Sequence, residues 1–236
     1  MTINQYDDPI ALFRSSWSTY QKIVEHNYMF HQELFSACKP ILQSLHKPIQ
    51  ILELGSGDAS LIKSLLCDFQ IKLYSGCDLS ENALQLAKIN LSNLDSTVEL
   101  NCIDMLSQLK RLESNSFDVI FSSFAIHHLS DDDKNLLFGE CYRVLKIPGF
   151  FILIDVIRNE DEGRQIYIEK YLNAVDTHWS ALTKAEFEQI SDHVRANDFP
   201  NTAKGYHQFA VHSGFASSQQ LAAFTWHQAW AYKKSS

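Results

Sequence analysis

The chain has 236 residues, of which 45% are hydrophobic and 20% are charged. Both values are close to the averages of folded proteins, and no low-complexity tract interrupts the sequence, so a fibrous or largely disordered chain is excluded. Twenty Lys and Arg against 28 Asp and Glu give a net charge of −8. This charge repels nucleic acids and anionic lipid surfaces, so we expect neither a nucleic acid nor a membrane as a partner.

Residues 1–13 lack the basic and apolar regions of a secretory signal, and no stretch approaches the roughly 18 consecutive apolar residues of a membrane span. The five cysteines are far apart and form no CxxC pair, so we expect them to be buried small side chains. These features predict a cytoplasmic protein. They give no indication of its oligomeric state.

Residues 1–46 show helical periodicity and carry many aromatic side chains, which at helical spacing usually pack in a core. From residue 49 to 157, short apolar runs alternate with helical patterns, which is typical of βαβ units and a parallel sheet. The predicted strands are 49–54, 71–78, 97–104, 117–124 and 150–157. The first and the last two of them are almost continuously apolar, so we place them centrally, with 71–78 and 97–104 toward an edge.

The remaining residues continue the same domain. Residues 158–205 have a mainly helical pattern, and residues 206–236 contain one more helix and two strands joined by a tight connection. No linker divides the chain, so we predict a single domain over 1–236. Ser80 and Ser130 precede helical patterns and are expected to cap them.

Two glycines follow the first strand directly and precede an amphipathic helix. Glycine has no Cβ, so the backbone at Gly55 and Gly57 can turn sharply and approach a ligand at the carboxyl end of the sheet. Asp78 ends the second strand, where its carboxylate can accept hydrogen bonds from the two hydroxyls of a ribose. A dinucleotide site would have a third glycine where Ser60 stands, and no phosphate-binding lysine follows. A nucleoside is therefore favoured over a phosphate-bound ligand.

At this point the sequence resembles the class I S-adenosylmethionine-dependent methyltransferases, small-molecule branch. Glu53, Gly55 and Gly57 match the first motif of that family, in which Ala59 replaces a third glycine. The resemblance continues in order over residues 49–156 and implies S-adenosylmethionine as the cofactor. The cofactor-binding residues that it implies are Glu53, Gly55, Ser56, Gly57, Asp78, Leu79, Asp104, Met105, Ser122 and Tyr20.

The resemblance also implies an architecture. The expected fold is a Rossmann-like, doubly wound, mostly parallel seven-stranded sheet with an antiparallel final strand. Residues 1–46 would form a helical lid over the cofactor, 49–157 the cofactor-binding core, 158–205 a helical substrate insertion, and 206–236 the closing helix and strands.

For the acceptor side, His127 follows the fourth strand and is the candidate general base or substrate contact. Tyr28, His178 and Trp179 are further candidates for substrate binding. The ten histidines show no HxH or HExxH spacing, so no metal site is predicted, and His128 is expected to pack or cap. Because the methyl transfer needs mainly alignment and exclusion of water, we expect it to be independent of metals.

The sequence thus predicts methyl transfer from S-adenosylmethionine to an oxygen, nitrogen or carbon atom of a small molecule. Two alternatives stay open. One is a nicotinamide-dependent oxidoreductase, and the other is a nucleoside-binding partner subunit without catalysis, which an intact glycine turn would also serve.

Overall fold

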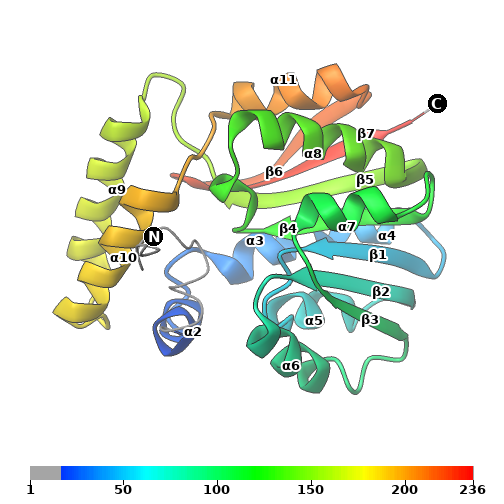
Figure 1. Cartoon of the computed structure of the whole chain (residues 1–236), viewed down its shortest axis with the longest axis horizontal. Helices are drawn as coiled ribbons and strands as arrows, with labels where there is room; N and C mark the ends of the chain where they lie inside the picture. Colours follow the sequence, from blue (N-terminus) through cyan, green and yellow to red (C-terminus); the bar gives the residue numbers. More distant parts are fainter. Residues whose placement is uncertain (1–16, 236) are drawn as a thin grey trace, which may run out of the picture.

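The computed structural model describes residues 17–235 and contains one seven-stranded sheet (Figure 1). The strand order is β3-β2-β1-β4-β5-β7-β6; β5 and β7 are antiparallel, and the pairs from β3 to β5 are parallel. The predicted Rossmann-like sheet with an antiparallel final strand is confirmed. The strands are β1 (Ile49–Leu54), β2 (Ile71–Asp78), β3 (Thr97–Cys102), β4 (Phe117–Ser123), β5 (Leu145–Val156), β6 (Ser217–Phe224) and β7 (His227–Lys234).

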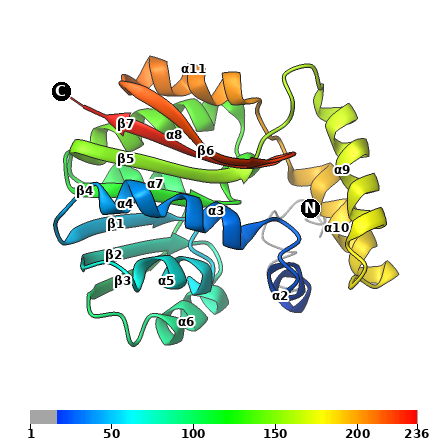
Figure 2. The ribbon, with the colours of Figure 1, turned by 180° about the vertical axis from the view of Figure 1, so that it is seen from behind.

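Helices cover both faces of the sheet, as Figures 1 and 2 show from opposite sides. On one face lie α3 (His31–Ala37), α4 (Lys39–Gln43), α5 (Ser60–Leu66) and α6 (Glu81–Asn90). On the other face lie α7 (Met105–Arg111), α8 (Asp131–Val144) and α11 (Ala203–Ser213). Each layer buries its own apolar cluster against alternate residues of the central strands, as the period of two in a strand requires.

The central strands are those that the sequence predicted. In β4, the residues from Phe117 to Ser122 are all buried, whereas the edge strand β3 has no fully buried residue. The largest boundary error is at β5, which begins at Leu145, five residues before the predicted strand 150–157; β3 also ends at Cys102, two residues before the predicted end at 104. Pro148 has no N–H for the ladder, and prolines are common in turns, but Leu145 already pairs with Phe117 across a register shift.

Two helices inserted between β5 and the last strands, α9 (Arg164–His178) and α10 (Lys184–Asn197), stand beside the carboxyl ends of β4 and β5 (Figure 1). They correspond to the predicted helical insertion. Thr183 begins α10 with a capping box, because its hydroxyl accepts the Glu186 N–H while the Glu186 carboxylate accepts the Thr183 N–H. Apolar side chains of α9, such as Tyr167, Leu172 and Val175, are buried in the same apolar cluster as one face of the sheet, so the insertion is packed against the core.

The helices before β1 differ in how they are attached. In α3 and α4, Leu34, Phe35 and Leu42 are buried in the sheet core, so these helices are part of that core. Helix α2 (Trp17–Glu25) contributes Ile23 to the same cluster, but it is also joined to the insertion, where the Lys22 ammonium lies 2.7 Å from the Glu186 carboxylate. The packing therefore restricts a lid to α2 among the residues described, and residues 1–16 of the predicted lid 1–46 lie outside them.

Between residues 17 and 235, no helix is long and apolar enough to cross a membrane. A cytoplasmic location remains a prediction of the sequence.

If α2 is a lid, removing its ionic attachment will loosen it. We expect Lys22→Ala to speed amide hydrogen exchange in α2 a few-fold, at most about fivefold, because a partly exposed ion pair contributes up to about 1 kcal/mol. Exchange in α3 should not change. Lys39→Ala, which removes an exposed ion pair to Asp68, is the matched control and should leave α2 unaffected. If α2 exchanges as slowly as α3 in both variants, it is a fixed part of the core and no lid.

Candidate active site

The glycine turn after β1 lies at the point where the strand order reverses, next to the loop that follows β4. At Gly55 the backbone has φ +73°, and a Cβ there would lie 2.5 Å from the Cβ of Ala125. Any larger residue would push the two loops apart. Open α/β sheets bind their ligands in the crevice at this reversal, so the turn is placed for a ligand.

Hydrogen bonds to the end of β2 fix this turn. The N–H groups of Gly55 and Ser56 both donate to the Cys77 carbonyl at 2.9 Å, and the Gly57 N–H donates to Asp78 Oδ2 at 2.9 Å. The other oxygen of Asp78 accepts the Ser80 N–H at 2.8 Å. Burial raises the pKa of Asp78, although these backbone donors oppose the shift. The predicted ribose-binding carboxylate is thus oriented at the rim of the turn.

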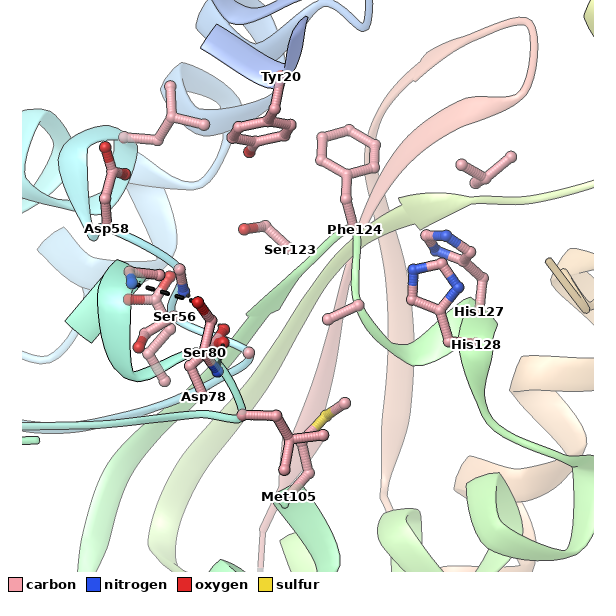
Figure 3. Close-up of a pocket in the computed structure, with 18 of the residues that line it drawn as sticks. Tyr20, Ser56, Asp58, Asp78, Ser80, Met105, Ser123, Phe124, His127 and His128 are labelled. Atoms are coloured by element: carbon pink, nitrogen blue, oxygen red, sulfur yellow. Dashed lines mark hydrogen bonds between the residues drawn. The ribbon is translucent and has the colours of Figure 1, made fainter. Parts of the chain in front are cut away.

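A cavity of about 320 Å³ begins at this turn and extends to the insertion. Its volume is in the range of small-molecule sites. One end is lined by the glycine turn and the ends of β2 and β3, and the other by η1 (Ile126–His128), α9 and α10. In Figure 3, Ser56 and Asp78 lie on one side of this space, and His127 and His128 lie on the opposite side, with Phe124 between them.

The first end of the cavity carries four carboxyl groups, from Glu53, Asp58, Asp78 and Asp104. Such a group of acids favours a positively charged ligand. Glu53 is the most buried of the four, with 2% of its surface exposed, and the Tyr74 hydroxyl donates to its carboxylate. Burial raises the pKa of Glu53 to about 8, although the Tyr74 hydrogen bond opposes the shift.

Nine of the ten predicted cofactor residues line the cavity. Tyr20 of α2 is one of them and closes the space from above in Figure 3. Asp104 also caps α7, since its carboxylate accepts the Ser107 N–H at 2.8 Å. Ser122 is the exception: it is fully buried, and its hydroxyl donates to the Leu54 carbonyl. The next residue, Ser123, lines the cavity in its place.

At the other end of the cavity, His127 is held by a buried carboxylate from β5. Its Nδ1 lies 2.5 Å from Asp155 Oδ1, and its backbone N–H donates to Asp155 Oδ2 at 3.0 Å. The ring is therefore fixed through Nδ1, and Nε2 lies 3.7 Å from the Asp198 carboxylate. Burial alone would lower the pKa of His127, but Asp155 and Asp198 outweigh it and raise that pKa.

Asp198 follows α10 and is brought to this place by contacts across the fold. The next residue, Phe199, donates its N–H to the His127 carbonyl at 2.8 Å, and the Arg164 guanidinium donates to the Asp198 carbonyl at 2.6 Å. The Asp198 carboxylate thereby lies 3.5 Å from His128 Nδ1 and 3.9 Å from His193 Nε2. Burial raises the pKa of Asp198 to about 6, against the effect of His127.

The predicted substrate residues divide into two groups. His127 and Trp179 line the cavity. Tyr28 lies behind Trp179, stacked on it at 5.2 Å between ring centroids, and its hydroxyl accepts the Ala181 N–H. His178 is exposed at the end of α9 and is not part of the lining. Tyr28 thus supports the wall rather than forming it.

Several residues of this end were not identified from the sequence: Phe124, Asp155, Tyr171, His193 and Asp198. Asp155 had a detectable signal, because an acid within an otherwise apolar central strand must find a buried partner. The residues of the insertion had no such signal in the sequence, because they reach the cavity only through the packing of α9 and α10 beside the sheet.

Comparison with known proteins agrees with this geometry. A family model described as a methyltransferase domain matches residues 52–153. A phosphoethanolamine N-methyltransferase from Plasmodium falciparum is 28% identical over 200 residues, which are 84% of this chain and 69% of that protein. A second such enzyme, from Caenorhabditis elegans, is 36% identical over 110 residues, which are 46% of this chain but 24% of that protein.

Among solved structures, human N-acetylserotonin methyltransferase in complex with S-adenosylmethionine superposes with a TM-score of 0.65 at 16% identity. The match covers 99% of this chain and 61% of that one. The chain contains a methyltransferase domain and has the fold of the class I S-adenosylmethionine-dependent methyltransferases. Its cofactor is S-adenosylmethionine and its reaction is methyl transfer. The oxidoreductase and the non-catalytic partner subunit find no support.

The carboxylate of Asp78 can be tested by calorimetry with S-adenosylhomocysteine, the demethylated cofactor. We expect Asp78→Ala to weaken binding, because each hydrogen bond lost from a charged group costs about 1.5–3 kcal/mol. Asp95→Ala, an exposed acid before β3, should bind as the parent does. Unchanged binding by a folded Asp78→Ala protein would contradict the placement of the ribose.

The raised pKa of Glu53 predicts a pH dependence of stability. The folded chain holds this proton up to a pKa of about 8, whereas the ordinary value is 4.5, so Glu53 lowers the free energy of unfolding progressively as pH rises between these values. We expect ligand-free Glu53→Gln to gain stability relative to the parent from pH 5 to pH 8 in urea unfolding. If both proteins change in parallel over this range, Glu53 does not hold its proton in the folded state.

Proposed function

We propose that the chain transfers the methyl group of S-adenosylmethionine to an oxygen, nitrogen or carbon atom of a small molecule bound between His127 and the insertion. The observation that carries this proposal is the single cavity that joins the glycine turn to the ends of α9 and α10. The names of the relatives, which methylate phosphoethanolamine and N-acetylserotonin, support a small acceptor.

The two ends of the cavity have different tasks in this proposal. The cofactor is held by Glu53, Gly55, Ser56, Gly57, Asp78, Leu79, Asp104, Met105 and Tyr20. Of these residues, Asp78 and Asp104 supply the negative charge that favours its positive charge. Ser122 lies behind the cavity lining and contributes indirectly, because its hydroxyl binds the Leu54 carbonyl at the end of β1. Trp179 and Tyr171 line the acceptor end of the cavity and exclude water from it. Domain roles follow: α2 covers the cofactor, and the insertion shapes the acceptor site.

S-adenosylmethionine supplies the methyl group as a sulfonium, so a lone pair of the acceptor forms the new bond to carbon while the carbon–sulfur pair passes to sulfur. The protein must align the acceptor in line with that bond. It must also take up a proton where the acceptor carries one. His127 is the proposed catalytic residue, because Asp155 fixes its Nδ1 and leaves Nε2 directed into the acceptor end.

The proposal is tested with labelled S-adenosylmethionine and a panel of phosphoethanolamine, small amines and phenols, by mass spectrometry of the methylated product. With an acceptor found, we expect His127→Ala to lower the rate about 10²–10⁴-fold, the usual effect of losing a positioned proton acceptor. Affinity for S-adenosylhomocysteine should stay the same.

His178→Ala is the control, since that histidine lies outside the cavity, and its rate should equal that of the parent. A near-parental rate in His127→Ala would contradict the role of His127 and leave alignment as the whole mechanism. Cofactor binding without turnover of any acceptor on the panel would contradict the proposed acceptor class.

A further inference from the structure

Three side chains at the acceptor end converge on one point. His127, His128 and Asp198 each present one metal-ligating atom, and these atoms all lie within 4.8 Å of one another. The sequence gave no reason to expect this, because His127 and His128 are adjacent while Asp198 comes about seventy residues later. The spacing that usually reveals a metal site is therefore missing.

One oxygen of the buried Asp198 carboxylate lacks a hydrogen-bond donor among the residues that the structure describes. Only 4% of Asp198 is exposed, and this oxygen is Oδ1. Its neighbours at 3.5–3.9 Å are ring nitrogens of His127, His128 and His193, beyond hydrogen-bond distance. Leaving a buried charge without donors is costly, so a cation among these nitrogens would supply what the protein does not.

A second carboxylate, that of Asp155, gives further support for a metal ion at this point. Asp155 lies against Nδ1 of His127, so Nε2 is the ring nitrogen left for a metal, and it lies 3.7 Å from Asp198 Oδ1. Histidines that ligate metals are almost always held in this way, with a carboxylate or carbonyl on the other ring nitrogen. Asp155 is itself fixed, since it also accepts the N–H groups of His127 and Val156.

We propose that His127, His128 and Asp198 bind a divalent transition-metal ion of the zinc class, with His193 beside it. Two imidazoles and one carboxylate, with further positions open, form the donor set of a catalytic rather than a structural zinc site. Bonds of about 2.0–2.1 Å place neighbouring ligand atoms roughly 3.3 Å apart, whereas Nε2 of His127 lies 3.7 Å from Asp198 Oδ1 and the three ligand atoms lie within 4.8 Å of one another, so metal binding has to draw them together. His128 Nδ1 lies 3.2 Å from the Asn197 carbonyl, so this ring has either to break that contact or to bind the metal through Nε2.

The consequence for catalysis rests on the proposed function. A metal ion at this point would take an acceptor oxygen or nitrogen as an additional ligand and lower its pKa. With an ion bound, Nε2 of His127 would be a ligand and could not accept a proton, so the proton of the acceptor would pass to solvent; His127 would accept it directly in the metal-free protein. The metal-binding step itself does not depend on the identity of the acceptor.

The test uses untagged protein freed of metal, titrated with Co²⁺ and followed by its visible absorption, and with Zn²⁺ against a coloured chelator. We expect one ion per chain. Asp155→Asn should weaken binding about 10–100-fold, as is usual when the group that orients a ligand is changed. Asp198→Asn and His128→Gln, which remove ligands, should weaken it further.

His212→Ala removes an exposed histidine of α11 and should bind as the parent does. Cys67 and Cys102 are exposed, contrary to the expectation that all five cysteines are buried. Cys67→Ser and Cys102→Ser therefore test these two thiols in the same way, and circular dichroism establishes that each variant is folded. Binding that His212→Ala or a cysteine variant abolishes, or that Asp198→Asn and His128→Gln leave intact, would overturn the site. So would the absence of any stoichiometric binding.

Calorimetry with S-adenosylhomocysteine separates this inference from the proposed function. A chain that binds S-adenosylhomocysteine but no metal refutes the metal site alone. A chain that binds one metal ion through the three ligands, yet methylates none of the small acceptors, supports the site and refutes the proposed function.

Discussion

The carboxylate of Asp155 is buried at the end of the central strand β5 and must be paired there with hydrogen-bond donors. The residues that supply these donors determine the geometry of the acceptor end of the site. Its oxygens accept N–H groups from His127 and Val156, and Nδ1 of His127 lies against it. These contacts tie β5 to the loop after β4. They also fix the orientation of the His127 ring. The need of a buried carboxylate for donors thus sets the orientation of the proposed catalytic residue.

A second constraint acts on the opposite side of the same crevice. The missing Cβ of Gly55 lets the turn after β1 approach the loop that contains Ala125, and this loop continues directly into His127. Cofactor and acceptor ends therefore share one short segment. The acids around Gly55 favour a cationic ligand, whereas the far end presents imidazoles, a carboxylate and the Trp179 ring. The cofactor end and the acceptor end of the cavity are therefore adjacent at the point where the strand order reverses.

Much of this could be predicted from the sequence because it is local. Continuous apolar runs identified the central strands, and Gly55, Gly57 and Asp78 stand at the ends of consecutive strands, where the topology must bring them together. Ser122 shows how sharply such reasoning depends on register. Neighbouring residues of a strand face opposite sides, so an error of one position selects the buried Ser122 instead of the cavity-lining Ser123.

The acceptor end could not be predicted in this way. Asp198 reaches His127 only because α9 and α10 dock beside the sheet and the Phe199 N–H binds the His127 carbonyl. No periodicity in the sequence encodes that contact.

The most direct test of the proposed site is a crystal structure of the chain with S-adenosylhomocysteine. Our account predicts the ribose at Asp78 and the sulfur facing His127. A ligand whose sulfur faces away from His127, or one bound outside this cavity, would contradict it.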